Sequence, residues 1–206
     1  MPKKQLNNII LPRGYISWSQ LSLYRQSKEK YINKYILGED VDIDNSGLKY
    51  GKIISELLEN NRKSENEAEN ILKIVLPKYK EREKEISVKM KTKYGDVVLL
   101  GKLDTYQSGK FREYKTGTIK WTQEKADKLD QITFYSLMLF IKNQEIPRSH
   151  LDWIKTQNID GEISLVGDIK SFEVKKSLSD LLLLKREIEK MAVDVSLLYW
   201  KRINQI

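Results

Sequence analysis

The sequence predicts an α/β protein in which a mainly helical part precedes a core that contains a β-sheet. Apolar residues recur at helical spacing in the first part of the chain, whereas alternation with a period of two begins at Ile86. Hydrophobic residues make up 40% of the chain and charged residues 32%, a balance typical of globular proteins. We therefore expect one domain over residues 1–206, with residues 1–80 mainly helical and residues 81–206 forming the α/β core.

Three helices are expected in the N-terminal part. Ser17 fits an N-cap, and the helix that it opens should end near Gly38. The apolar residues of segment 53–58 indicate a second helix. Ser64 begins a capping box for a third helix, which Pro77 should stop.

A β-hairpin and its neighbouring strand follow. Apolar and charged residues alternate from Ile86 to Thr92, which predicts a half-buried strand. A turn at Gly95 leads into a strand over Val97–Tyr106. Ser108-Gly109 predicts a second tight turn, and the next strand should run through Tyr114.

The C-terminal third predicts two helices with strands between them. Thr122 can cap a helix that reaches about Ile141. Short strands are expected at Leu151–Thr156 and Ser171–Val174. Ser177 then caps a long helix with apolar residues at helical spacing.

Composition excludes several kinds of site. The chain has no cysteine, which excludes disulfides, zinc–thiolate sites and iron–sulfur clusters. His150 is the only histidine, which excludes a two-histidine metal site and a Ser-His-Asp triad. No apolar run reaches the roughly 18 residues of a membrane span, and no signal peptide is evident. We expect a soluble cytoplasmic protein without a membrane partner.

The net charge of +8 favours a polyanionic partner such as DNA, because each phosphate contact releases counterions. Residues 1–34 hold seven basic residues and one acidic residue. Charge alone, however, is equally consistent with a solvated basic surface.

Two carboxylates are expected to face each other on the predicted hairpin. If Ser108-Gly109 is the turn, Asp104 lies opposite Glu113, and Lys102 lies opposite Lys115, with side chains about 5 Å apart. Facing carboxylates repel each other unless a cation lies between them, and Mg²⁺ is bound by one or two carboxylates plus waters and phosphate oxygens. This arrangement favours metal-assisted phosphodiester hydrolysis.

Lys115 shares the face of Glu113, where its ammonium can bind a phosphate oxygen or influence an attacking water. The alternative is an exposed charged hairpin in which both carboxylates pair with nearby lysines. The spacing alone does not decide between these two interpretations.

Four motifs resemble those of the RecB-type exonuclease family within the PD-(D/E)XK nuclease superfamily. Gly101–Asp104 is similar to the family's GxxD strand, and Arg112–Gly117 to the strand that carries an acid, a lysine, a threonine and a glycine. Asp130–Tyr135 resembles the QxxxY helix, and Tyr15–Tyr24 resembles the first-helix signature. The motifs occur in the family's order and cover most of the chain.

The resemblance implies a restriction-endonuclease-like core, with a central mixed sheet flanked by helices. It implies a Mg²⁺- or Mn²⁺-dependent deoxyribonuclease that acts on DNA ends or single strands. Asp104, Glu113 and the backbone carbonyl of Tyr114 would bind the metal. Gln131 would orient Lys115 or water, and Tyr135 would contact the DNA backbone. The implied catalytic residues are Asp104, Glu113, Lys115, Gln131 and Tyr135.

Two departures from the family pattern affect the prediction. Ser55 stands where the family often has a metal-binding histidine, and Glu56 or Glu59 could substitute only in part. The four cysteines of many CRISPR-associated relatives are missing, and Ser27 lies near the first expected position, which implies a cluster-free nuclease. The alternatives are a catalytically weak or inactive DNA-binding or assembly module of the same fold, and a structure-specific endonuclease.

Overall fold

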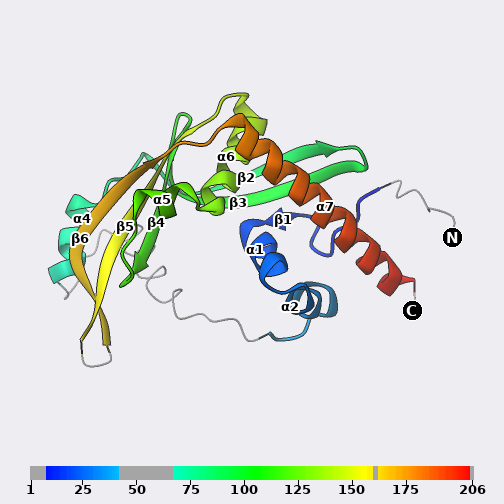
Figure 1. Ribbon diagram of the computed structural model, residues 1–206, viewed down its shortest axis with the longest axis horizontal. Coiled ribbons are helices and arrows are strands. Elements are labelled where there is room, and N and C mark those ends of the chain that lie inside the picture. Colours follow the sequence, from blue (N-terminus) through cyan, green and yellow to red (C-terminus); the bar gives the residue numbers. More distant parts are fainter. Residues whose placement is uncertain (1–7, 42–66, 160–161, 205–206) are drawn as a thin grey trace.

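Six strands form one mixed sheet in the part of the chain that the computed structural model describes, which is residues 8–41, 67–159 and 162–204. Helices lie on both faces of this sheet (Figure 1). The strand order is β1-β3-β4-β5-β6, and β2 also pairs with β3. The predicted α/β class, with a central mixed sheet flanked by helices, is confirmed.

The element bounds follow the chain. The strands are β1 Ile16–Ser17, β2 Glu81–Thr92, β3 Gly95–Gln107, β4 Lys110–Gly117, β5 Arg148–Ile159 and β6 Glu162–Val174. The helices are α1 Trp18–Gln26, α2 Lys28–Tyr31, the π-helix η1 Ile32–Leu37, α4 Glu67–Val75, α5 Gln123–Asp127, α6 Asp130–Asn143 and α7 Leu178–Ile203.

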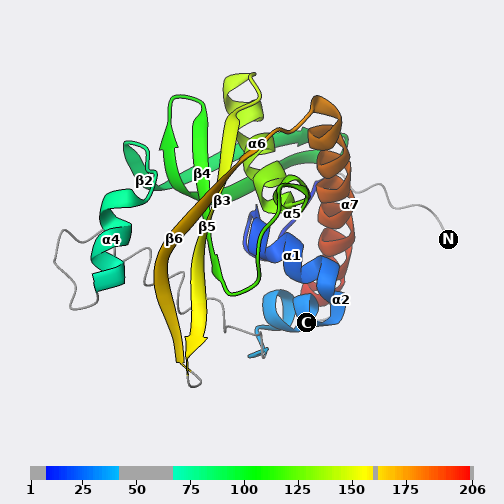
Figure 2. The same cartoon turned by 60° about the vertical axis from the view of Figure 1, so that its left-hand side comes forward.

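Strand β4 lies in the middle of the sheet, between an antiparallel and a parallel neighbour. It pairs antiparallel with β3 and parallel with β5, while β5 and β6 form an antiparallel hairpin (Figure 2). Helices α5 and α6 lie between β4 and β5 in the chain, so they supply the long connection that parallel neighbours require.

The two faces of the sheet bury different clusters. The larger cluster packs α1, α6 and α7 against the sheet, with Phe111 and Leu151 contributed by β4 and β5. The smaller cluster joins α4 to Tyr114 and Ile154 of the same two strands. Because side chains alternate along a strand, β4 presents Phe111, Glu113 and Lys115 towards α6, and Tyr114 towards α4.

The predicted strands are present, and β2, β5 and β6 are several residues longer than expected. Strand β5 starts before Leu151 and continues past Thr156, and β6 begins far ahead of Ser171. The added residues extend the β5–β6 ladder beyond the predicted strands, and they include many polar side chains. The period of two therefore gives a weak signal in this part of the sequence.

Two predicted helices are broken, although their ends are correct. Ser27 has extended backbone, and its side chain accepts a hydrogen bond from the Lys30 N–H, so α1 ends and α2 begins at one residue. Such a local side-chain bond competes with helix continuation. The helix that Thr122 caps stops at Asp127, and the extended Leu129 redirects the chain before α6.

The remaining helix predictions are either confirmed or lie outside the described residues. Gly38 ends η1 with a left-handed φ of 74°, and Ser177 forms a capping box with Asp180 at the start of α7. Helix α4 ends before Pro77, as expected. The predicted helix around 53–58 and the cap at Ser64 lie outside the described residues, and the division into two parts near residue 80 stays a prediction.

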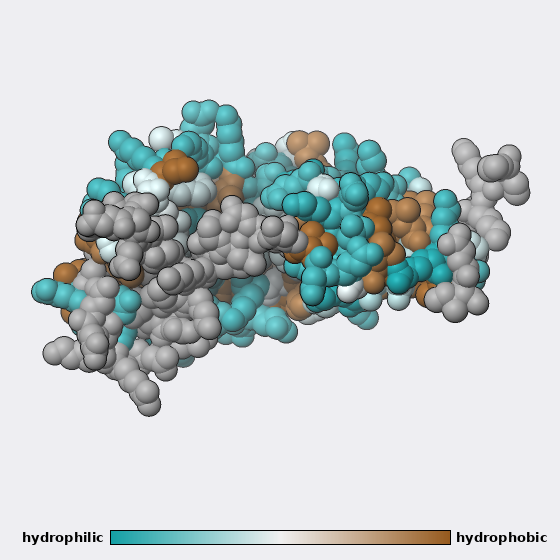
Figure 3. All heavy atoms as spheres, turned by 90° about the horizontal axis from the view of Figure 1, so that it is seen from below, coloured by the Kyte–Doolittle hydropathy of each residue, from teal (hydrophilic) through white to brown (hydrophobic). Residues whose placement is uncertain are grey.

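None of the helices that the structure describes has the length and apolar character needed to cross a membrane. The face shown in Figure 3 is mostly hydrophilic, with apolar residues in several separate groups.

Candidate active site

Strand β3 passes from one neighbour to another near the centre of the sheet, and we call the place where β3 and β4 separate the fork. One edge of β3 pairs with β1 at Leu99 and Leu100, and then with β4 from Thr105 onward. Segment 101–104 therefore has no strand partner on that edge. On the other edge, the ladder with β2 skips Glu83, whose φ is 49° and which would otherwise lie opposite Asp104. Asp104 thus lies where the pairing is interrupted on both sides.

The fork corrects the predicted register. The pairs Gln107–Lys110, Tyr106–Phe111 and Thr105–Arg112 form as the turn predicts. The ladder ends there, so the predicted pairing of Asp104 with Glu113 and of Lys102 with Lys115 is wrong. The Cα partner of Lys102 is Glu85 of β2, and its ammonium forms an ion pair with Glu83.

The physical reason for the fork is the Asp104 side chain. Its Oδ2 accepts a hydrogen bond of 2.6 Å from the backbone N–H of Tyr114, which replaces a bond that the ladder would have made. In a strand, the N–H and C=O of one residue point to the same edge. The Tyr114 carbonyl therefore also faces the fork, beside the Asp104 carboxylate.

A chain of hydrogen bonds joins four of the predicted site residues. Lys115 Nζ donates to Glu113 Oε1 over 2.8 Å and to Gln131 Oε1 over 2.6 Å. Gln131 Nε2 then donates to the Tyr135 hydroxyl over 3.1 Å. Gln131 and Tyr135 lie one turn apart on α6, so a single helix positions both against β4.

Burial controls the protonation of the two carboxylates. Glu113 is 3% exposed, and burial raises its pKa although the Lys115 ammonium lowers it. Burial, followed by the charge of Glu113, raises the pKa of Asp104 to about 8. Burial also raises the pKa of Tyr135, so its phenol stays protonated at neutral pH.

One buried atom of the site lacks a partner. Glu113 Oε2 is inaccessible to solvent and accepts no hydrogen bond from the described residues. An unsatisfied carboxylate oxygen is costly to bury unless a ligand completes it. A cation between Glu113 and Asp104 would do so, and it would also relieve the repulsion that raises the Asp104 pKa.

The donors fit a hard divalent cation better than a soft one. Two carboxylates and the Tyr114 carbonyl make an oxygen-only set, which suits Mg²⁺ or Mn²⁺ when waters and phosphate oxygens fill the remaining positions. Within residues 8–41, 67–159 and 162–204, no group of three or more His, Asp or Glu side chains could hold a metal. The set is thus small for a protein-only site, as it is in Mg²⁺ sites that rely on substrate oxygens.

Gly101 permits the close packing of α6 on β3. A Cβ atom at this position would lie 2.9 Å from both Met138 Sδ and Tyr135 Cε1. A larger residue would therefore push α6 away from the fork. The sequence identified Gly101 only as part of a motif, whereas the structure gives its physical role.

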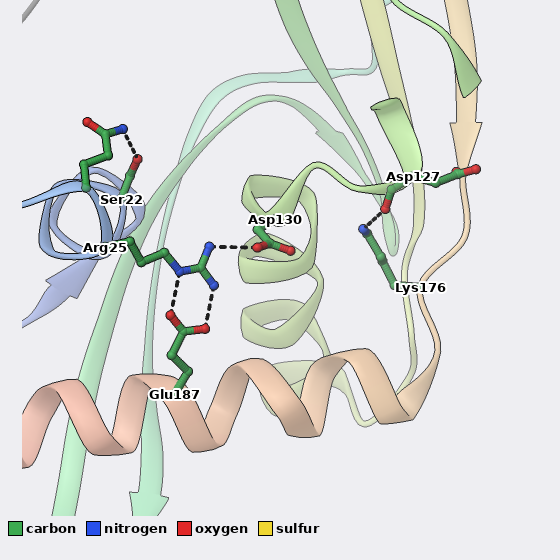
Figure 4. Close-up of polar contacts among 7 residues, drawn as sticks. Ser22, Arg25, Asp127, Asp130, Lys176 and Glu187 are labelled. Carbon is green, nitrogen blue, oxygen red and sulfur yellow. Dashed lines mark hydrogen bonds and ion pairs between the residues drawn. The ribbon is translucent and has the colours of Figure 1, made fainter. Parts of the chain in front are cut away.

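Arg25 joins the start of α6 to two other helices (Figure 4). Its guanidinium donates two hydrogen bonds of 2.6 Å to Glu187 on α7, and one of 2.7 Å to Asp130 on α6. Asp130 immediately precedes Gln131, so this ion-pair cluster helps to fix the helix that carries two site residues. Arg25 was not predicted from the sequence, because its partners lie far away in the chain.

The predicted departure at Ser55, and its neighbours Glu56 and Glu59, lie outside the described residues. The structure otherwise places Asp104, Glu113 and Tyr114 around one fork, with Lys115, Gln131 and Tyr135 beside them.

Comparison with known proteins supports a nuclease-like fold. No family model matches the sequence, and no curated protein matches it significantly. The structure of a candidate exonuclease from Eubacterium rectale is similar, with a TM-score of 0.59 and 14% identity, over 91% of this chain and 83% of that one. The structure of SSO0001 is 14% identical over 95% of this chain and 78% of that one, but its TM-score of 0.47 is too low to support any argument. At such identity, the first similarity shows the fold alone.

Proposed function

We propose that this protein is a divalent-metal-dependent DNA nuclease that hydrolyses phosphodiester bonds at the β3–β4 fork. The observation that carries the proposal is the pair of carboxylates Asp104 and Glu113, one with an unsatisfied buried oxygen, beside the ammonium of Lys115. The polar atoms of a buried structural ion pair are usually all hydrogen-bonded. The resemblance to RecB-type nucleases and the nuclease-like fold add support.

Asp104, Glu113 and the Tyr114 carbonyl would hold Mg²⁺ or Mn²⁺. When bound, the metal supplies Lewis-acid activation of water and neutralises charge on the reacting phosphate. The two carboxylates would hold the metal from two separate strands, so the position of the phosphate would depend on the geometry of the fork.

The other residues bind and orient the substrate. Lys115 uses two of its three N–H donors for Glu113 and Gln131, which leaves one for a phosphate oxygen. The Tyr135 hydroxyl accepts from Gln131, so its own proton is available to a second phosphate oxygen. Gln131 orients Lys115 and Tyr135 relative to each other, because its amide bonds to both side chains.

We further propose that the enzyme acts on single strands or DNA ends. This finer proposal rests on the family resemblance, and the net charge of +8 is consistent with DNA as the partner.

The test incubates the full-length protein with end-labelled linear and closed circular DNA, single- and double-stranded, in Mg²⁺, Mn²⁺ or EDTA. We expect release of short products from linear single strands with either metal, and none in EDTA. Cleavage of closed circles would contradict the preference for ends and favour an endonuclease.

A second candidate function is a DNA-binding or assembly module that has lost activity. The observation in its favour is the small ligand set of two carboxylates within the described residues. DNA binding without cleavage under every metal would establish this alternative and refute the nuclease proposal.

A further inference from the structure

A pocket of about 370 Å³ adjoins the hydrogen-bonded chain of the candidate active site. It lies between the N-terminal segment, the unpaired edge of β3 and helix α6. Gln131 and Tyr135 belong both to the pocket and to that chain. Its other lining residues are Tyr15, Ser17, Trp18, Ser19, Glu85, Leu100, Gly101 and Lys102.

The two aromatic rings of the N-terminal segment differ in their surroundings. Trp18 is held by Arg25, whose guanidinium lies 5.6 Å from the ring centroid, and by Phe134, whose ring centroid lies 6.3 Å away. Tyr15 is half-buried, yet it makes no hydrogen bond, ring contact or ion contact with the residues described by the structure. Tyr15 therefore offers an unoccupied aromatic ring in a pocket whose other aromatic wall is fixed.

Three polar residues of the pocket, Lys102, Gln131 and Tyr135, border the fork, and Glu85 and two serines line the rest. Lys102 projects from segment 101–104, and its side chain is 57% exposed although its ammonium is paired with Glu83. The Tyr135 hydroxyl, with a proton to donate, lies on the same side as Gln131. The pocket thus combines a free aromatic ring with phosphate-binding groups, which is the arrangement that single-stranded nucleic acids require.

The size of the pocket restricts what can occupy it. Its volume is near the lower end of the range for small-molecule sites, roughly 300–1,000 Å³, which suits one nucleotide. We propose that the pocket holds one unpaired nucleotide of a single-stranded DNA end, with its base stacked on Tyr15 and its phosphate towards Lys102 and Tyr135. The proposal deepens the proposed function, on which it rests for the identity of the substrate.

The first experiment measures the binding of a fluorescent six-residue thymidine oligonucleotide in EDTA, where no cleavage is expected. We expect Tyr15→Ala to weaken binding about tenfold, since loss of one base–aromatic stack costs about five- to a hundredfold. Tyr15→Phe keeps the ring and should bind within about twofold of the unmodified protein, on the same basis. Tyr94→Ala is the matched control, because Tyr94 lies on the β2–β3 turn in a separate pocket.

A second experiment needs no change to the protein. An abasic unit is moved through the oligonucleotide one position at a time. We expect one position near an end to weaken binding as much as Tyr15→Ala does, and the two losses should not add. Blunt duplex DNA should bind Tyr15→Ala as well as it binds the unmodified protein.

The outcomes separate this proposal from the nuclease proposal. Equal binding of single strands by Tyr15→Ala and the unmodified protein would overturn the pocket proposal even if cleavage is observed. So would an abasic scan in which no position matters. Conversely, Tyr15-dependent binding of single strands without cleavage in any metal would support the pocket and refute the nuclease.

Discussion

Strand β4 carries two charged pairs on opposite faces, and they differ in how fully their polar atoms are bonded. On the face of Tyr114, Arg112 donates to both oxygens of Asp152, over 2.6 and 2.8 Å, and Ser171 donates to the same carboxylate. On the face of α6, Glu113 uses one oxygen for Lys115 and leaves the other without a partner in the described structure.

The difference separates a structural pair from the pair that we propose to be reactive. Asp152 is completely buried and fully bonded, so its pair with Arg112 holds β4, β5 and β6 together and leaves no capacity for a ligand. In the other pair, Glu113 retains an oxygen without a partner, and the partly exposed Lys115 retains an N–H donor. Unsatisfied, pKa-shifted groups on a rigid strand are typical of functional sites.

The largest expected effect is on cleavage. Asp104→Asn keeps an oxygen acceptor for the Tyr114 N–H but removes the charge that would hold the metal. We expect a loss of DNA cleavage on the order of ten-thousandfold, which corresponds to about 5 kcal/mol of transition-state stabilisation. The measurement is the initial rate of release from an end-labelled single strand at saturating Mg²⁺.

Asp96→Asn is the control for this change, because Asp96 is an exposed residue of the same strand. It should cleave at the unmodified rate. Cleavage that survives both Asp104→Asn and Glu113→Gln would show that the reactive site lies elsewhere.

The Arg112 pair should affect stability and not chemistry. Arg112→Met leaves the buried Asp152 carboxylate unpaired, which costs about 3–5 kcal/mol of unfolding free energy. The double variant Arg112→Met with Asp152→Leu should recover most of that loss, because no buried charge remains. Both are measured by urea denaturation followed by circular dichroism.

Cleavage by the folded fraction of these variants should stay within a few fold of the unmodified rate. If a fully folded double variant loses cleavage, then the two faces of β4 are coupled, and the Arg112–Asp152 pair is not purely structural.

A smaller effect is expected at Gln131, which links Lys115 to Tyr135. Gln131→Leu removes one acceptor of Lys115 and the donor to Tyr135, so both groups lose their orientation. We expect cleavage to fall about ten- to a hundredfold, the usual range for residues that orient a ligand-binding group. Gln123→Leu on α5 is the control, and metal affinity should be unchanged in both variants.

The sequence predicted which residues lie together at the candidate site better than it predicted their arrangement. The turn at Ser108-Gly109 set the correct register for three pairs, and the spacing brought Asp104 and Glu113 to the same hairpin. The fork was not predicted, because it depends on a side chain that takes a backbone N–H from the opposite strand. Continuing the register outward from the turn assumes that backbone groups of the two strands bond only to each other.

The structural pair was also beyond sequence analysis. Arg112 and Asp152 are 40 residues apart, and they meet only because β4 and β5 are parallel neighbours. The same holds for Gly101, because the atoms that leave no room for a side chain there belong to Met138 and Tyr135 on α6. Local periodicity carries information about elements, whereas these contacts depend on which elements become neighbours.

The smallest expected effect is a pH dependence of stability in the metal-free protein. The pKa of Asp104 is raised to about 8 in the folded state, so the folded protein binds more protons than the unfolded chain between about pH 4 and pH 8. Stability should therefore fall as pH rises through this window, and Glu113 contributes in the same direction. Because Asp104 is partly exposed and solvent screens its charge, we expect a loss on the order of 1–2 kcal/mol.

Asp104→Asn should flatten the decline in unfolding free energy, measured by urea denaturation in EDTA at each pH. Added Mg²⁺ should reverse the slope, since the metal binds the deprotonated carboxylates and stabilises the folded protein more as pH rises. A decline of the same size in Asp104→Asn would mean that Asp104 does not cause the pH dependence. A slope that Mg²⁺ leaves unchanged would mean that the carboxylates at the fork do not bind the metal.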